Sequence, residues 1–253
     1  HNKKIVTQKP FELPNSLHIN IDLNVEELIW QTHNFKKIRG KFILANQAVN
    51  IKYFNLQTLQ GAVSGNLKLD HLLEKGNSIE GQIKLKNINV KRLFLDWNNF
   101  NQTAITDKNL SGTLSGDIDL LLLFDQYFTL IDDKMFAKTN FKINNGAITE
   151  METMRSITEF MRSNKTLKLI LNKHIDKFET KLLNLTFEEL SNTIEIKNRK
   201  LYIPKMAIKS NALDVNLSGW HDFDNNIDYH FSFRFRELKS DLNESEFGII
   251  EDD

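Results

Sequence analysis

Apolar and polar residues alternate along the first clear segment of the chain, "LHINIDLNV" (17–25). Every odd position in this segment is apolar and every even position is polar. A period of two over nine residues predicts a strand with one apolar and one polar face. The alternation recurs in "GKFILANQAVNIKYFNLQ" (40–57), with a predicted turn at Asn46–Gln47, and in segments 58–70 and 78–88.

Strands are predicted along most of the remaining chain as well. The segment "TNFKINNGAIT" (139–149) predicts a strand that turns at Asn145–Gly146. Because strand follows strand with short polar connections, we expect antiparallel pairing. The other predicted strands are 112–120, 182–190, 193–197, 200–210, 213–220 and 227–237.

Three segments carry apolar residues at helical spacing instead. In "VKRLFLDWNNF" (90–100) the apolar residues recur at i, i+3, i+4 and i+7, which predicts a helix near 90–99. Thr149 and Glu152 have the spacing of a capping box, and a methionine stripe (Met151, Met154, Met161) follows them. This stripe favours a core-facing helix, with a lid over one end of a groove as the alternative. A further helix is predicted over 167–178, so helices fall near 150–178.

Glycines inside predicted strands form a repeated pattern. "GAVSGNLKL" (61–69) and "GTLSGDIDL" (112–120) share one frame, although glycine weakens a strand interior. Glycine also marks bulges and sharp curvature in sheets. We therefore predict a mainly β protein whose long antiparallel sheet is strongly curved into an apolar groove, like a half-barrel, with a few short helices. A closed β-sandwich or barrel is the alternative.

The predicted groove wall consists of apolar residues that share one strand face. Periodicity alone does not separate a groove from a closed core, because both need one apolar face. The candidates for contact with a lipid are Ile19, Ile21, Leu23, Phe42, Leu44, Ile83, Leu85, Ile118 and Leu120.

Charge and composition narrow the classes of partner. Lys and Arg together number 33 and Asp and Glu also number 33, so no basic excess favours binding to nucleic acid. The chain has no cysteine, which excludes disulfides and thiol chemistry. No apolar run approaches the roughly 18 residues of a transmembrane helix. We expect a soluble chain, or the soluble part of an anchored protein.

Catalytic and metal chemistry find little support in the sequence. Ligand-type residues gather only in "HDFDNNIDYH" (221–230), as His221, Asp222, Asp224, Asp228 and His230. A hairpin turn explains this cluster better than a metal site, because Asp and Asn are the typical residues of turns. No nucleophile motif or phosphate-binding loop occurs, so we expect no enzyme activity and no cofactor.

The last third of the chain resembles the C-terminal region of AsmA-like proteins of the Gram-negative envelope. The resemblance rests on "IEIKN" (194–198), "IPKMAIKSNAL" (203–213), "LSGWHDFDNNIDY" (217–229) and "SEFGIIEDD" (245–253). Earlier segments such as "INIDLNVEELIW" (19–30) and "GAVSGNLKLD" (61–70) are similar to the family's strand-turn frame. The similarity covers most of the chain, from about Leu17 onwards.

This resemblance implies a periplasmic β-groove that is anchored to the inner membrane by a helix near the N-terminus. The family is related to proteins that move lipids between membranes and is implicated in phospholipid traffic and outer-membrane integrity. The chain lacks the anchor helix and stops at Asp253, where relatives continue, so we expect a fragment.

The expected domain is one elongated unit, 1–253, with possible parts 10–125 and 126–253. Its expected partner is a phospholipid or another acyl-chain lipid. The alternative is a structural or accessory subunit of an envelope complex, with a protein partner.

Overall fold

The structure is a computed structural model that describes residues 16–72, 76–101, 103, 105–166, 168, 175–212, 214–224 and 226–233. Its strands form a single antiparallel sheet in which each strand pairs with its neighbours in the sequence. The strands are β1 (Ile19–Trp30), β2 (His33–Ala45), β3 (Ala48–Thr58), β4 (Gly61–Leu72), β5 (Gly76–Asn89), β6 (Leu110–Phe124), β7 (Phe136–Thr149), β8 (Asn184–Lys197), β9 (Lys200–Ile208), β10 (Val215–Asp222) and β11 (Ile227–Phe233).

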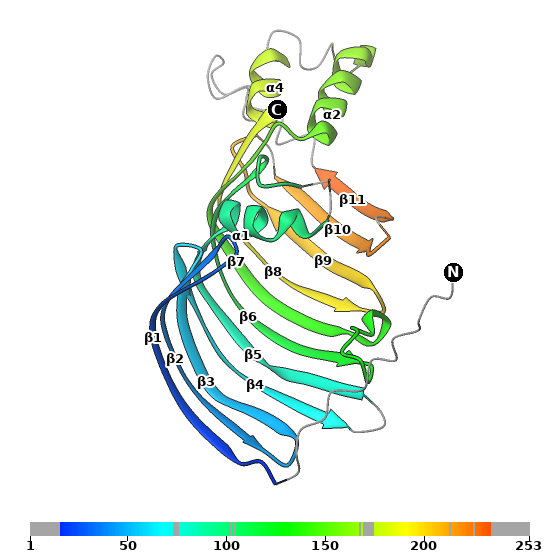
Figure 1. Cartoon of the computed structure of the whole chain (residues 1–253). Coiled ribbons are helices and arrows are strands. Elements are labelled where there is room, and N and C mark those ends of the chain that lie inside the picture. Colours follow the sequence, from blue (N-terminus) through cyan, green and yellow to red (C-terminus); the bar gives the residue numbers. More distant parts are fainter. Residues whose placement is uncertain are drawn as a thin grey trace, which may run out of the picture.

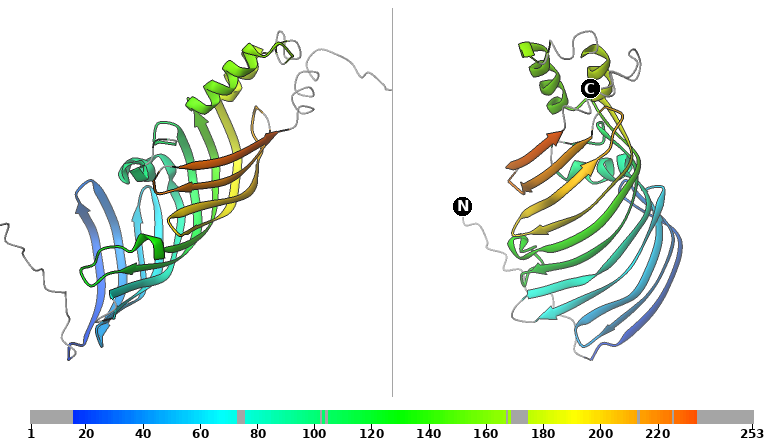
Figure 2. Two further views of the ribbon diagram at one scale, coloured as in Figure 1. Left: turned by 90° about the vertical axis from the view of Figure 1, so that its right-hand side faces the viewer. Right: turned by 180° about the vertical axis from the view of Figure 1, so that it is seen from behind.

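The sheet is strongly curved but stays open, with β1 at one edge and β11 at the other (Figures 1 and 2). The predicted fold class is therefore confirmed, and the alternative of a closed sandwich or barrel is wrong. Local connections explain the order, because short turns join strands that lie side by side. At Asn46–Gln47, for example, both residues adopt positive φ angles of 51° and 60°, as tight hairpin turns require.

The α-helices among the described residues lie at one end of the strands, which we call the helical end (Figure 1). Helix α1 (Val90–Asp96) follows β5, and the 3-10 turn η1 (Asn98–Asn101) follows α1 directly. At the same end α2 (Glu152–Ser163) follows β7 and α4 (Ile175–Leu183) precedes β8. The short 3-10 turn η2 (Asp132–Lys134) lies at the opposite end, between β6 and β7. The helix predicted near 90–99 is confirmed.

Several local predictions were wrong, and one falls partly outside the described residues. Thr149 ends β7, and α2 begins after Met151 with no side-chain cap, so the capping box does not form. In the predicted helix 167–178, residues 167 and 169–174 lie outside the described residues, and the described helix α4 continues to Leu183. Strand 58–70 is interrupted by a turn at Leu59–Gln60.

A further correction concerns β7. The predicted turn at Asn145–Gly146 is absent, because β7 continues through both residues to Thr149 and pairs with β8 on either side. Asn145 has a positive φ of 49°, which Asn tolerates better than most residues. The Asn-Gly pair therefore produces a local irregularity inside a strand, and the strand does not reverse there.

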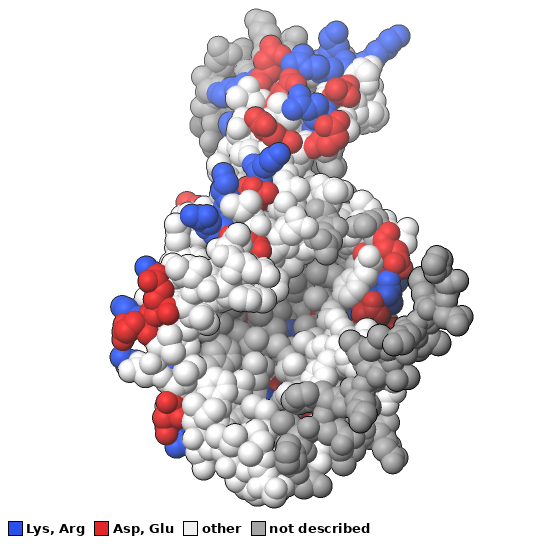
Figure 3. Space-filling view, in the orientation of Figure 1, with Lys and Arg blue, Asp and Glu red and all other residues white. Residues whose placement is uncertain are grey.

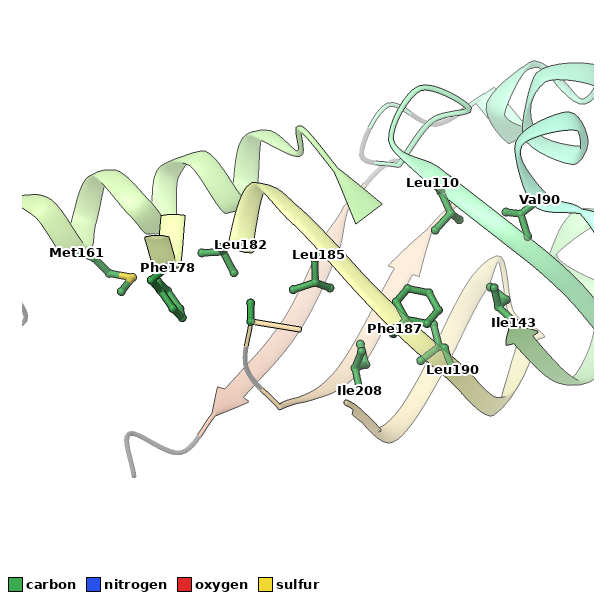
Figure 4. Close-up of a cluster of buried hydrophobic side chains, with 11 residues drawn as sticks. Val90, Leu110, Ile143, Met161, Phe178, Leu182, Leu185, Phe187, Leu190 and Ile208 are labelled. Atoms are coloured by element: carbon green, nitrogen blue, oxygen red, sulfur yellow. The ribbon is translucent and has the colours of Figure 1, made fainter. Parts of the chain in front are cut away.

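The buried core is confined to the helical end of the sheet (Figure 4). Leu182 and Phe178 of α4 pack there with Met161 of α2, while Met154 packs against the cluster. The core-facing interpretation of the methionine stripe is thus confirmed for Met154 and Met161. The buried members of this core are Val90, Leu110, Ile143, Met161, Phe178, Leu182, Leu185, Phe187, Leu190, Ile208 and Ala212.

The second glycine of each repeat, Gly65 or Gly116, lies close against the backbone of a neighbouring strand. A Cβ atom at Gly116 would lie 2.6 Å from the carbonyl oxygen of Asn140 on β7. At Gly65 it would collide with the carbonyl oxygen of Gln82 on β5 and meet the ring of Phe54. No side chain fits at such distances, so glycine permits the tight approach of strands inside the curve.

Candidate functional site

The apolar face of the sheet can be followed strand by strand through its register. Ile21 pairs with Phe42, Phe42 with Ile51, and Ile51 with Leu67. The row continues through Gly81 of β5 to Leu120 of β6 and Ala137 of β7. Cross-strand partners project to the same side of a sheet, so this row forms one continuous apolar line.

Parallel rows on the same face contain the other predicted residues. Ile19 pairs with Leu44, and Leu23 pairs with Gly40, which lies two positions before Phe42 on β2. Ile83 pairs with Ile118, and Leu85 lies two positions beyond Ile83 on β5. The structure therefore brings all the predicted groove residues onto one face: Ile19, Ile21, Leu23, Phe42, Leu44, Ile83, Leu85, Ile118 and Leu120.

This face is the inside of the curve. Further along the same face, Leu114 pairs with Ile143, and Ile143 with Leu190 in the buried core. Helix α1 also packs on this side, because Val90 belongs to that core, and the figures place α1 within the curve of the sheet. We call the rows beyond the core, towards the end opposite the helices, the trough.

Burial distinguishes the trough from the core. Core side chains are less than 9% exposed, whereas Ile19 and Ile21 are 38% and 47% exposed, and the other predicted residues are partly exposed. The described strands form only one sheet, so no second sheet covers the trough. Figure 3 shows the corresponding hollow, whose visible wall carries few charged side chains. The sequence thus leaves a contiguous apolar surface open on its concave side.

The opposite, convex face carries the charges. Cross-strand ion pairs join Asp22 to Lys41 at 3.7 Å and Lys84 to Asp117 at 3.6 Å. Lys142 donates a hydrogen bond of 2.8 Å to Glu189, which lowers the pKa of that carboxyl group below its usual value. Such exposed pairs contribute little stability each, but they keep this face hydrated. The sheet is therefore amphipathic, with water on its convex side.

The sequence prediction missed trough residues on β3, which contains a bulge, and on β8. The β2–β3 register shifts between Lys41 and Phe42, so Tyr53 faces outwards opposite Lys41. Phe54 instead pairs with Gly65 and faces the trough, together with Ile51. Ile194 and Ile196 of β8 continue the rows across β7, through Thr139 and Ala137. The same alternation in 193–197 could have found the β8 residues, whereas the bulge has no clear sequence signal.

A hollow of about 560 Å³ crosses strands β3 to β6 and reaches β7. Ile51, Leu67, Gly81 and Leu120, which belong to one register row, contribute to its lining together with their neighbours along each strand. Neighbours along a strand alternate in polarity, so the lining is a mixture of polar and apolar residues. The hollow is also wide open to solvent. The hollow is thus a shallow surface feature.

The ligand-type cluster at 221–230 forms a turn between β10 and β11. The carboxylate of Asp222 accepts hydrogen bonds from the backbone N–H groups of Asp224 and Asn226 and from the Asn226 side chain. The Asn226 side chain is the main reason why the pKa of Asp222 is lowered. Asp224 pairs with Arg199 at 2.7 Å. Within the described ranges no group of three or more potential ligands could hold a metal ion.

Comparison of the chain with models of protein families, with curated proteins and with solved structures gave no match. Across the described parts of the chain, none of the helices has both the length and the apolar content needed to cross a bilayer.

Proposed function

We propose that the trough binds the acyl chains of a phospholipid or a similar lipid. In this proposal the chain is a non-catalytic lipid-binding or lipid-transfer module of an AsmA-like protein. It acts in the periplasm, held at the inner membrane by an anchor helix outside this sequence, and serves phospholipid traffic and outer-membrane integrity. One observation carries the proposal: a continuous apolar face, several strands wide, lies on the concave side of one sheet and stays partly exposed.

The energetics favour such a ligand. A soluble protein rarely leaves a large contiguous apolar surface in contact with water unless that surface binds something. Burial of one methylene group contributes about 0.8 kcal/mol, so ten methylenes contribute about 8 kcal/mol before the costs of binding. An open trough also lets the headgroup stay in water while the chain lies against residues such as Phe42, Ile83 and Ile118.

A second candidate function follows from the edge of the sheet. Strand β1 is 12 residues long and pairs only with β2 among the described strands, so its other edge can accept a partner strand. On this proposal the chain is a structural or accessory subunit of an envelope complex. The trough would then be a scaffold that holds the edge in place.

Native mass spectrometry of protein purified without detergent separates these two functions. If the trough binds lipid, the spectrum will show the chain with a mass increment equal to one or more phospholipids, and solvent extraction will recover the same species. Lipid-free protein in a fixed-ratio complex with another protein would instead support the accessory role. Lipid-free protein alone would overturn the lipid-binding proposal.

A further inference from the structure

Large apolar side chains gather at the helical end, where the β1–β2 turn meets α1 and η1. Trp30 stacks on His33 with ring centroids 5.9 Å apart, and His33 lies 6.2 Å from the ring of Trp97. Trp97 stacks in turn on Phe100 at 6.4 Å. The rings therefore form one continuous chain across two segments far apart in the sequence. We call the exposed rings of this chain the aromatic patch: Trp30, Trp97 and Phe100.

These side chains face solvent despite their size. Each of them is 51–60% exposed, which exceeds the exposure of any predicted trough residue. Two of the chain's three tryptophans belong to the patch. A contiguous exposed patch of this kind marks an interaction site, and tryptophan is the residue most typical of the membrane–water interface.

Basic residues border the patch on α1. Lys91 and Arg92 are both exposed, and they lie one helical turn before Leu95 on the outer side of this helix. The inner side of α1, with Val90 and Phe94, packs against the core. On the strand side, the carboxylate of Glu27 is already paired with Lys36 at 3.5 Å, and the carboxylate of Asp96, beside Trp97, lies 3.9 Å from Nδ1 of His33. The positive charge beside the patch complements the negative surface of a membrane that contains anionic lipid.

We propose that the aromatic patch docks the protein on the surface of a lipid bilayer. The aromatic side chains enter the boundary between headgroups and acyl chains, while Lys91 and Arg92 contact anionic headgroups. Lysine is depleted at protein–protein interfaces, whereas basic side chains beside tryptophan are typical of surfaces that bind a membrane. The stack of Trp97 on Phe100 and the packing of α1 on the core hold the patch in place before it meets a membrane.

The patch lies at the helical end of β1 and β2, where Trp30 pairs with His33, and other positions of the same two strands, such as Ile21 and Phe42, line the trough. Docking therefore brings the helical end of these strands to the bilayer, from which a lipid would enter the trough along β1 and β2. This route of entry rests on the proposed function, whereas the docking itself does not.

Binding to vesicles tests the docking. Protein is mixed with vesicles of equal parts phosphatidylcholine and phosphatidylglycerol, and the bound fraction is measured by flotation. We expect the double variant Trp30→Ser, Trp97→Ser to lose at least about tenfold in partitioning. Phe160→Ser removes an equally exposed ring on α2, outside the patch, and should bind as the unchanged chain does. Equal binding of both variants, or no binding of the unchanged chain, overturns the proposal.

Fluorescence provides a readout that does not depend on the double variant folding. In Trp220→Phe the remaining tryptophans are Trp30 and Trp97, so its emission reports the patch alone. On anionic vesicles we expect a blue shift and quenching by lipids brominated along the acyl chain. Unchanged emission in the presence of vesicles contradicts bilayer docking. A concentration-dependent dimer that the double variant abolishes would assign the patch to a second copy of the chain and also overturn it.

Lipid loading is measured on the same samples. If the double variant retains extractable lipid but no longer floats, docking and lipid binding are separate properties and both proposals stand. If the unchanged protein floats but never contains lipid, the docking stands and the proposed function of the trough fails.

Discussion

Bound lipid is expected to fall at least about tenfold in Leu120→Asp and to stay unchanged in Leu121→Asp. The two leucines are adjacent on β6 and both are partly exposed, but they project to opposite faces. Leu120 lies in the register row of Ile51, Leu67 and Gly81, where a carboxylate would be desolvated against an acyl chain. Leu121 pairs with Phe136 and Glu80 on the convex face. Lipid is quantified by extraction and mass spectrometry.

Each variant serves as the control for the other, because both introduce the same charge into the same strand. Thermal unfolding shows whether the fold is retained, which we expect because neither position is in the buried core. Ile21→Asp repeats the test at the edge strand, where the side chain is 47% exposed and the carboxylate remains hydrated in the empty protein. Equal lipid content in Leu120→Asp and Leu121→Asp would contradict the assignment of the faces.

The free energy of unfolding is expected to fall by about 3–5 kcal/mol in Phe187→Ala. Phe187 is only 4% exposed and pairs with Gly146, where no side chain could fit beneath its ring. Removal of the ring leaves a cavity in the core that joins β8 to the helices. Net stabilities of domains are only about 5–15 kcal/mol, so this single change removes a large part of the total.

Urea unfolding followed by circular dichroism measures this loss. Phe54→Ala is the matched control, because Phe54 faces the open trough and is only partly buried. Its change should be clearly smaller. If both variants lose the same stability, the trough is packed as tightly as the core, and the distinction between the two regions fails.

Alternation predicted most of the strands and their faces. In β1, β5 and β6 the polar and apolar positions follow a period of two for many residues, and the predicted side of Ile19, Ile83 and Ile118 agrees with the register. This works because a strand with water on one side must keep its polar residues on that side. The repeated glycines likewise pointed to curvature, because glycine inside a strand marks a bulge, a bend or the close approach of another segment.

Local motifs predicted less well when tertiary contacts decided the outcome. Asn145–Gly146 has the composition of a tight turn, yet β8 pairs with β7 on both sides of it, and these ladder bonds keep the chain extended. The bulge before Phe54 reverses the faces of Tyr53 and Phe54, and nothing in the residues themselves places it there. Likewise, periodicity did not separate core positions such as Leu110 from trough positions such as Ile118 on the same strand. That difference depends on where α1, α2 and α4 pack.

Photo-crosslinking tests the central claim most directly. The amino acid p-benzoylphenylalanine is placed at Leu120 in one sample and at Leu121 in another, the purified proteins are illuminated with their bound lipid, and intact masses are recorded. The account predicts an adduct with the mass of a phospholipid from position 120 and none from position 121. Lipid adducts of equal yield from both faces, or from position 121 alone, would contradict the claim that the concave face of this sheet holds the lipid.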